Sequence, residues 1–159
     1  MAAFELPSIE KLQTIIGGLV MGGVTAEPCD PSEISDRTVK AIYETDSCQS
    51  AALCCCDIPL SNFLGASLSM IPAGQANEYA NSGALPENIK DNLTEVLNVA
   101  ANLFITPESK RLKLKEVLGP GDSFDEVLAG MIKSPAAQSC VTVNVCRYGS
   151  GRMSFLLTK

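Results

Sequence analysis

The sequence predicts an α+β domain with a mostly antiparallel sheet. Candidate strands fall into two groups of three, and the connections between strands are turn-rich, which favours antiparallel pairing. A candidate helix precedes each group and further helical segments lie between the groups, which suits long helices packed on one face of a sheet. Because the two halves have the same order, we expect a six-stranded sheet with pseudo-two-fold halves in a single domain, residues 1–159.

The first half opens with a helix expected over residues 7–21. Pro7 suits a first turn, and the glycines at residues 22–23 end the segment. Between them an apolar stripe recurs at helical spacing: Leu12, Ile15, Ile16 and Leu19. Three strands follow, where apolar runs are separated by turn residues: 24–29, 37–45 and 50–56.

Two helical segments come next. Asp57 can cap a helix that has Pro59 in its first turn and ends near Met70. Pro72 opens a shorter segment that ends at residues 81–83, which are Asn, Ser and Gly.

The second half repeats this pattern. Its helix, the longest of the chain, is expected over residues 86–105, because Pro86 suits the start and Pro107 forces the end. Residues 124–132 fit either a short helix or a covering loop. The strands and the hairpin turn between the last two are expected at residues 111–118, 139–147 and 152–158, with the turn at 148–151.

The composition excludes several classes of function. The chain has 159 residues, of which 46% are hydrophobic and 19% charged, so a packed core is expected rather than disorder. With a net charge of −6 and no long Lys/Arg cluster, it lacks the electrostatic footprint of nucleic-acid binding. Because it has no His, Ser-His and Cys-His nucleophilic pairs are excluded. Carboxylates, amides, hydroxyls and thiols remain for any chemistry.

The chain has seven cysteines, and none of them has CxxC spacing. Cys54, Cys55 and Cys56 are contiguous in an apolar run, where successive strand side chains point to opposite faces and cannot converge on one metal ion. We interpret them as small buried hydrophobic residues and expect no metal site in this chain. Free thiols of this kind indicate a reducing compartment, so we expect a cytoplasmic protein.

Neither secretion nor membrane insertion is expected. The apolar stretch at residues 15–24 is interrupted by four glycines and preceded by Glu5 and Glu10, unlike a signal peptide. No segment approaches the ~20 apolar residues of a membrane span.

The helix expected over residues 86–105 has two distinct sides. At ~100° per residue, its apolar positions gather on one side: Ile89, Leu93, Val96, Leu97, Ala100, Leu103 and Phe104. On the opposite side, four polar residues stand at i, i+4, i+7 and i+11 in a single line: Asp91, Glu95, Asn98 and Asn102.

Two interpretations of this polar line remain open. Most such lines are the solvated side of an amphipathic helix. However, Asn88, Asn92, Asn98 and Asn102 all occupy this helix, although Asn is a poor helix former. Since function tends to override local stability at active sites, the line is also a candidate functional site.

The segment Asp91-Asn-Leu-Thr-Glu95-Val-Leu-Asn98 resembles the signature of the CheC/CheX family of chemotaxis phosphatases. That signature has Asp or Ser, three residues, Glu, two residues, Asn and a later Pro. All three helical positions match, and Pro120 follows after twenty-one residues, one fewer than in the family. Leu97 stands where the family often has Gly. The order of helices and strands is also similar over nearly the whole chain, which implies a CheC-like fold.

Members of the family carry one or two such sites. If the halves are pseudo-repeats, the first helix is the counterpart of the helix at residues 86–105. There Glu10 is followed by Gln13 rather than Asn, and Leu6 replaces Asp or Ser. The degenerate first copy suggests a single active site, as in CheX-like members.

The resemblance implies that the chain hydrolyses the aspartyl phosphate of a CheY-like response regulator. Asn98 would enter the partner's pocket and orient a water in line with the phosphorus, and Glu95 would pair with a Lys of the partner. Asp91 and Asn102 would support the contact at its edge. The partner would supply Mg²⁺, so this chain would need no cofactor of its own.

Two other classes of function remain. The same architecture resembles domains of flagellar switch and adaptor proteins, in which a response regulator would be bound but not hydrolysed. A small-molecule sensor with a pocket under Phe63 or Phe104 is the third reading.

A basic stretch precedes the second group of strands, at Lys110, Arg111, Lys113 and Lys115. We interpret it as a solvated strand face rather than an anion site.

A homodimer is also expected, because relatives with a single site often form homodimers. Apolar residues of the last strands could supply a dimer edge or face, or could serve an ordinary core: Val141, Val143, Val145, Phe155 and Leu157.

Overall fold

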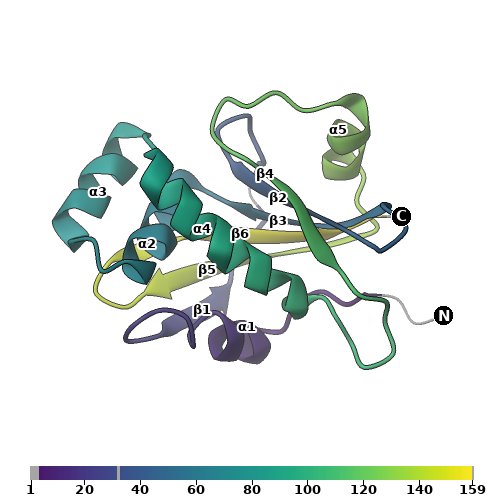
Figure 1. Cartoon of the computed structure of the whole chain (residues 1–159), viewed down its shortest axis with the longest axis horizontal. Helices are drawn as coiled ribbons and strands as arrows, with labels where there is room; N and C mark the ends of the chain where they lie inside the picture. Colours follow the sequence, from purple (N-terminus) through teal and green to yellow (C-terminus); the bar gives the residue numbers. More distant parts are fainter. Residues whose placement is uncertain (1–3, 32, 159) are drawn as a thin grey trace.

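A six-stranded sheet runs through the molecule, with strands in the order β1-β5-β6-β3-β2-β4 and every neighbouring pair antiparallel (Figure 1). The computed structural model describes residues 4–31 and 33–158. The strands are β1 (Val24–Pro28), β2 (Val39–Glu44), β3 (Ser50–Cys56), β4 (Lys113–Leu118), β5 (Ala137–Val145) and β6 (Gly149–Leu157). The helices are α1 (Ile9–Ile15), α2 (Ile58–Leu68), α3 (Ala73–Ser82), α4 (Glu87–Ala100) and α5 (Glu126–Lys133), and the 3-10 turn η1 (Ala101–Leu103) follows α4.

The order of the strands shows the pseudo-two-fold symmetry that the sequence predicts. Exchanging β1, β2 and β3 with β4, β5 and β6 gives the same order read from the opposite edge of the sheet, so the symmetry axis passes between β3 and β6. Helix α1 precedes β1 in the first half, and α4 precedes β4 in the second. The α+β prediction with one antiparallel sheet is therefore confirmed.

Helices α1, α2 and α4 cover one face of the sheet and enclose the main core. The apolar side of α4 is buried there as predicted, and it packs with inward side chains of the central strands such as Tyr43, Cys54 and Phe155. Phe104 lies between Tyr43 and Phe155, at centroid distances of 5.6 and 5.8 Å, so its ring fills the core.

Helix α5 covers part of the opposite face. Leu128 of α5 packs there with Ile42, Leu53, Cys55 and Leu156 in a second, smaller core. Asp125 caps this helix, because its Oδ1 accepts a hydrogen bond from Leu128 N (2.9 Å). The segment for which the sequence left a helix and a loop open is thus mainly a helix.

Three sequence-based boundaries were wrong by three residues or more. Helix α1 ends at Ile15 rather than residue 21, because glycines 17 and 18 favour the turn that follows. The long helix ends as α-helix at Ala100 and tightens into η1 instead of continuing to residue 105.

The third wrong boundary is the β5–β6 turn. The turn consists of residues 146–148, with Arg147 at φ 73° and Tyr148 N donating to Val145 O (2.9 Å). Gly149 and Gly151 belong to β6 rather than to the turn. They lie where α2 passes too close to the strand for a Cβ. A Cβ at Gly149 would lie 2.8 Å from Phe63 Cε2, and one at Gly151 would lie 2.5 Å from Leu60 Cβ.

The three consecutive cysteines of β3 alternate between the two cores. Cys54 and Cys56 face the main core and Cys55 faces the second, and all three are buried. Their interpretation as small buried hydrophobic residues on alternate faces of a strand is confirmed. Burial raises the pKa of the Cys55 thiol from 9.0 to about 12.

We expect the protein to lose stability above pH 9, in part through Cys55. The folded state keeps this thiol protonated up to its raised pKa of about 12, whereas the unfolded chain releases the proton near pH 9. The contribution is therefore complete below pH 9 and is lost as the pH rises through this window, by about 1.4 kcal/mol per pH unit. Urea unfolding at several pH values should show a shallower fall for Cys55→Ala, and an unchanged slope would contradict the prediction.

A second prediction is that Cys29 and Cys140, which face each other at the end of the β1–β5 pair, can be oxidised to a disulfide. Their Sγ atoms are 2.9 Å apart, and Cys29 N donates to Cys140 O (3.1 Å), a pairing that places the Cα atoms within the range of a disulfide. We expect hydrogen peroxide or diamide to join them, with the loss of two hydrogen atoms. Since burial raises the pKa of Cys29, the reaction should accelerate with rising pH. Peptide mapping would identify the bond, with Cys29→Ser as the control, and a bond to Cys48 instead would refute this assignment.

Candidate functional site

Helix α4 carries the predicted polar line and is held from three sides. Pro86 stands at its start, and Lys90 N donates to Pro86 O (2.9 Å) in the first turn. From the sheet below, the buried Tyr43 hydroxyl donates to Leu97 O (2.6 Å). At the side, α2 approaches so closely that a Cβ on Gly65 would lie 2.7 Å from Ile89 Cγ2. These contacts make α4 a rigid support.

The polar line faces solvent along α4. Asp91, Glu95, Asn98 and Asn102 are all exposed. Within residues 4–31 and 33–158, the side chains of Asp91, Glu95 and Asn98 have no hydrogen bond or salt bridge to one another or to other side chains. Their carboxylate and amide groups are therefore free to contact a partner.

The structure distinguishes the four asparagines of this helical segment. Asn92 binds α2, because its Nδ2 donates to Gly65 O (3.0 Å) and Ser69 Oγ (2.6 Å). Asn102 lies in η1, beyond the α-helical part of the line, and its Nδ2 donates to Val99 O (3.1 Å). Asn88 and Asn98 are exposed. The hydrogen bonds with α2 thus explain why an asparagine stands at position 92. No hydrogen bond within the described chain explains the asparagine at position 98.

The turn that contains Pro120 lies beside the first half of α4. A Cβ at Gly119 would be 3.4 Å from Lys90 Cε, and Lys90 Nζ lies 3.9 Å from Asp122 Oδ2. Gly121 N donates to Asp36 O (2.9 Å), which ties this turn to the loop before β2. Pro120 thus lies in a turn beside the helix that carries Asp91, Glu95 and Asn98.

The first-half counterpart of the site has a structural role instead. Gln13 lies on α1, and its Oε1 accepts a hydrogen bond from Ala26 N of β1 (2.9 Å). Leu6 precedes Ser8, the N-cap of α1, so it is not part of the helix. The amide that corresponds to Asn98 is therefore engaged with the edge of the sheet.

The structure contains a buried lysine that the sequence did not reveal. It lies on the face of the sheet opposite to α4. Lys40 of β2 is 1% exposed, and its Nζ donates to Ser35 O (2.7 Å) and Thr38 O (2.9 Å) and lies 4.9 Å from the centre of the Phe124 ring. Desolvation lowers the pKa of Lys40. Its contacts join the loop before β2 to the segment before α5, which is a structural role that only the packing shows.

Metal and membrane sites are not apparent in the described part of the chain. Residues 4–31 and 33–158 contain no cluster of three His, Cys, Asp or Glu side chains placed to hold a metal ion. None of the helices in these ranges combines the length and apolar character that crossing a membrane requires.

Comparison with known proteins identifies the fold. No family model matches the sequence, and no curated protein matches it. Among solved structures, the chain is similar to the FliM middle domain of H. pylori, with a TM-score of 0.53, 6% identity and coverage of 94% of this chain and 84% of that one. It is also similar to the FliM–SpeE complex of H. pylori, with a TM-score of 0.61, 5% identity and coverage of 94% and 81%.

A third similar structure is the CheX–CheY–BeF3–Mg²⁺ complex of Borrelia burgdorferi, with a TM-score of 0.51 and 6% identity over 92% of each chain. The predicted CheC-like fold is confirmed by these matches. At 5 to 6% identity, they establish the fold alone.

Proposed function

We propose that this chain, which has the fold shared by CheX and the FliM middle domain, is a phosphatase for the aspartyl phosphate of a CheY-like response regulator. The observation that carries the proposal is the exposed Glu95–Asn98 pair on α4. Both side chains match the signature, and neither has a side-chain partner within the described chain. The CheX match supports the proposal, because that structure contains CheY and Mg²⁺.

In this mechanism Asn98 positions the attacking water. Its side-chain carbonyl would accept a hydrogen bond from the water and hold it in line with the phosphorus. The water oxygen forms the new P–O bond, and the bond from phosphorus to the aspartyl oxygen breaks. The products are inorganic phosphate and a free carboxylate on the partner. Phosphoryl transfer gains strongly from such positioning, which a side chain on a rigid helix can provide.

Glu95 and Asp91 would hold the helix against the partner. Glu95 stands one turn before Asn98 on the same side of α4, so its carboxylate can pair with a partner Lys while the amide enters the partner's pocket. Asp91 and Asn102 would lie at the two ends of the contact. We expect Mg²⁺ in the partner, where it would neutralise charge on the phosphoryl oxygens, and no cofactor in this chain.

A non-catalytic adaptor is the second candidate, and the matches to FliM favour it. In that case the same side of α4 would bind a response regulator without shortening the lifetime of its phosphate. The exposed amide of Asn98 favours the phosphatase, because binding alone does not require an amide beside a carboxylate on the same side.

The deciding experiment measures how long a CheY-like regulator from the same genome stays phosphorylated in the presence of Mg²⁺, with and without this protein. A shorter lifetime would support the phosphatase. Binding with an unchanged lifetime would support the adaptor. Neither binding nor a shorter lifetime with any regulator of that genome would contradict both proposals.

A further inference from the structure

The two edges of the sheet differ in their capacity to accept another strand. Along β1, Ala26 N points away from β5 and donates to Gln13 Oε1 (2.9 Å). Two positions further, Pro28 has no N–H to offer. Every second N–H group along an edge strand points away from its neighbour. At two successive outward positions of β1, the N–H group is therefore either already bonded or missing. The β1 edge is therefore closed to strand addition.

The β4 edge is open. β4 pairs only with β2, and the backbone groups on its outer side have no hydrogen-bond partner among residues 4–31 and 33–158. Its residues Lys113, Lys115 and Glu116 are exposed. Unpaired N–H and C=O groups in a row are a template for an added strand.

The β4 edge is also strongly basic within an acidic protein. Lys110, Arg111, Lys113 and Lys115 are four of the 12 basic residues, although the chain has a net charge of −6. In the described structure, Lys113 is the one of these four with an acidic partner, Glu44 Oε1 at 3.9 Å. Lys113 and Lys115 lie on β4 and alternate with Leu114, which packs with the main core, so they share the opposite face. Lys110 and Arg111 are exposed just before the strand.

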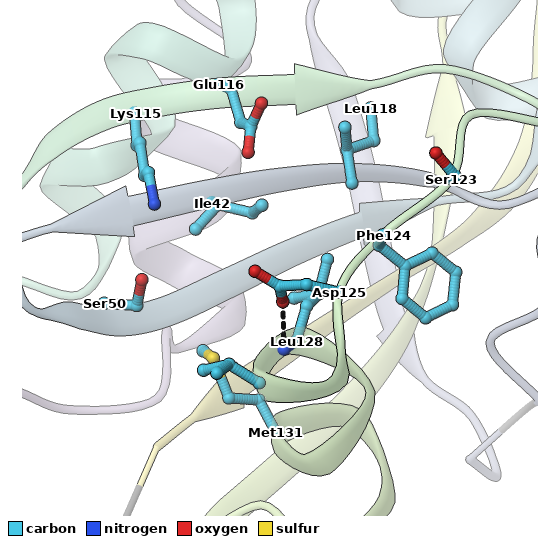
Figure 2. A pocket seen from close by; sticks show the side chains of 11 residues that line it. Ile42, Ser50, Lys115, Glu116, Leu118, Ser123, Phe124, Asp125, Leu128 and Met131 are labelled. Atoms are coloured by element: carbon cyan, nitrogen blue, oxygen red, sulfur yellow. Dashed lines mark hydrogen bonds between the residues drawn. The ribbon is translucent and has the colours of Figure 1, made fainter.

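An irregularity in the pairing places Lys115 beside a groove that the carboxylates of Glu116 and Asp125 also line. The β2–β4 register shifts between Ile42 and Tyr43, so Lys115 and Glu116 both line the groove beside β4 (Figure 2). The groove has a volume of about 410 Å³, and its far wall is formed by α5. Phe124 and Val127 at this wall are 37% and 69% exposed, so apolar surface is available next to the basic strand.

We propose that the β4 edge binds an acidic, extended segment of another protein by strand addition. The backbone of that segment would pair with the outer side of β4, and carboxylates at alternate positions would face Arg111, Lys113 and Lys115. An apolar side chain of the segment would contact the rim of the groove near Phe124.

The charge of β4 argues against a second copy of this chain at the same edge. Two copies of β4 paired antiparallel about Lys113 or Leu114 would place basic side chains opposite one another, and like charges on facing strands are destabilising. The β4 edge is also separate from the α4 site, because α4 packs in the main core whereas the groove lies on the side of Ile42 and Leu128. Both surfaces could be occupied together.

The test titrates the whole chain with a fluorescent peptide in which Glu alternates with Val or Thr. We expect saturable binding, and we expect the amide hydrogens of β4 to become protected from exchange in the complex. A peptide with Lys in place of Glu should not bind. Lys115→Glu should weaken binding by about tenfold, whereas Lys133→Glu, the same change at an exposed site on α5, should leave it unchanged.

Several outcomes would overturn the proposal. They are equal binding of the acidic and basic peptides, equal effects of the two substitutions, or protection of amides elsewhere than β4. Self-association that protects the β4 amides in the absence of peptide would instead assign the edge to a second copy. Because the α4 helix is not involved, none of these results depends on phosphatase activity.

Discussion

Replacing Asn98 with alanine should abolish the accelerated dephosphorylation of the partner while the protein stays folded. If the amide positions the attacking water, its loss removes positioning that is worth about 100-fold or more in rate. The folded state should not suffer, because Asn98 is exposed and alanine is the better helix former. We expect equal or slightly higher resistance to urea, and a regulator lifetime equal to that without the protein.

Asn88→Ala is the matched control for this experiment. It makes the same change at another exposed position on the same side of α4, but ten residues before Asn98, which is about 15 Å along the helix axis. This variant should retain the full effect on the regulator. Glu95→Ala should act differently, since it weakens engagement: the concentration needed for half-maximal acceleration should rise while the rate at saturation changes less. Full activity of Asn98→Ala would refute the proposed role of the amide.

Replacing Gly65 with alanine should destabilise the protein through the contact between α2 and α4. The added Cβ would meet Ile89 Cγ2 at 2.7 Å and also the Ile89 backbone, which cannot move without shifting α4. Overpacking of this kind costs about 1–3 kcal/mol. The same shift would displace Asn98, so we expect lower phosphatase activity together with a lower urea midpoint.

Gly130→Ala provides the matched control for Gly65→Ala. Gly130 lies inside α5, and a Cβ there would meet no atom within 4 Å. Alanine should therefore stabilise this helix by about 0.5–1 kcal/mol. If both variants changed the urea midpoint in the same direction, close packing at Gly65 would not explain its effect.

Several features of the fold and of the proposed site could be predicted, because each depends only on the residues of a single helix or strand. The apolar positions of α4 repeat at helical spacing and are buried as expected, so the line from Asp91 to Asn98 had to face solvent. Alternation along β3 likewise placed Cys55 opposite to Cys54 and Cys56. Caps such as Asp57 and Asp125 are local, because their side chains bind the helix that they begin.

Other features could not be deduced, because they depend on which distant segments lie together. Gly149 and Gly151 resemble turn residues in the sequence, yet their small size serves the approach of α2 to β6. Asn92 and Asn98 are equivalent as residue types, and only the neighbouring α2 shows that one of them is engaged in packing.

The period of each element, the buried side of α4 and its exposed polar line can all be deduced from the amino-acid order, because they follow from the geometry of a single helix or strand. Which edge of the sheet is closed and which is open depends instead on contacts between distant segments. Gln13 of α1 closes the β1 edge, whereas the outer backbone groups of β4 have no hydrogen-bond partner in the described chain. Hydrogen bonds between segments far apart in the chain have no local period, so no sequence pattern could assign them.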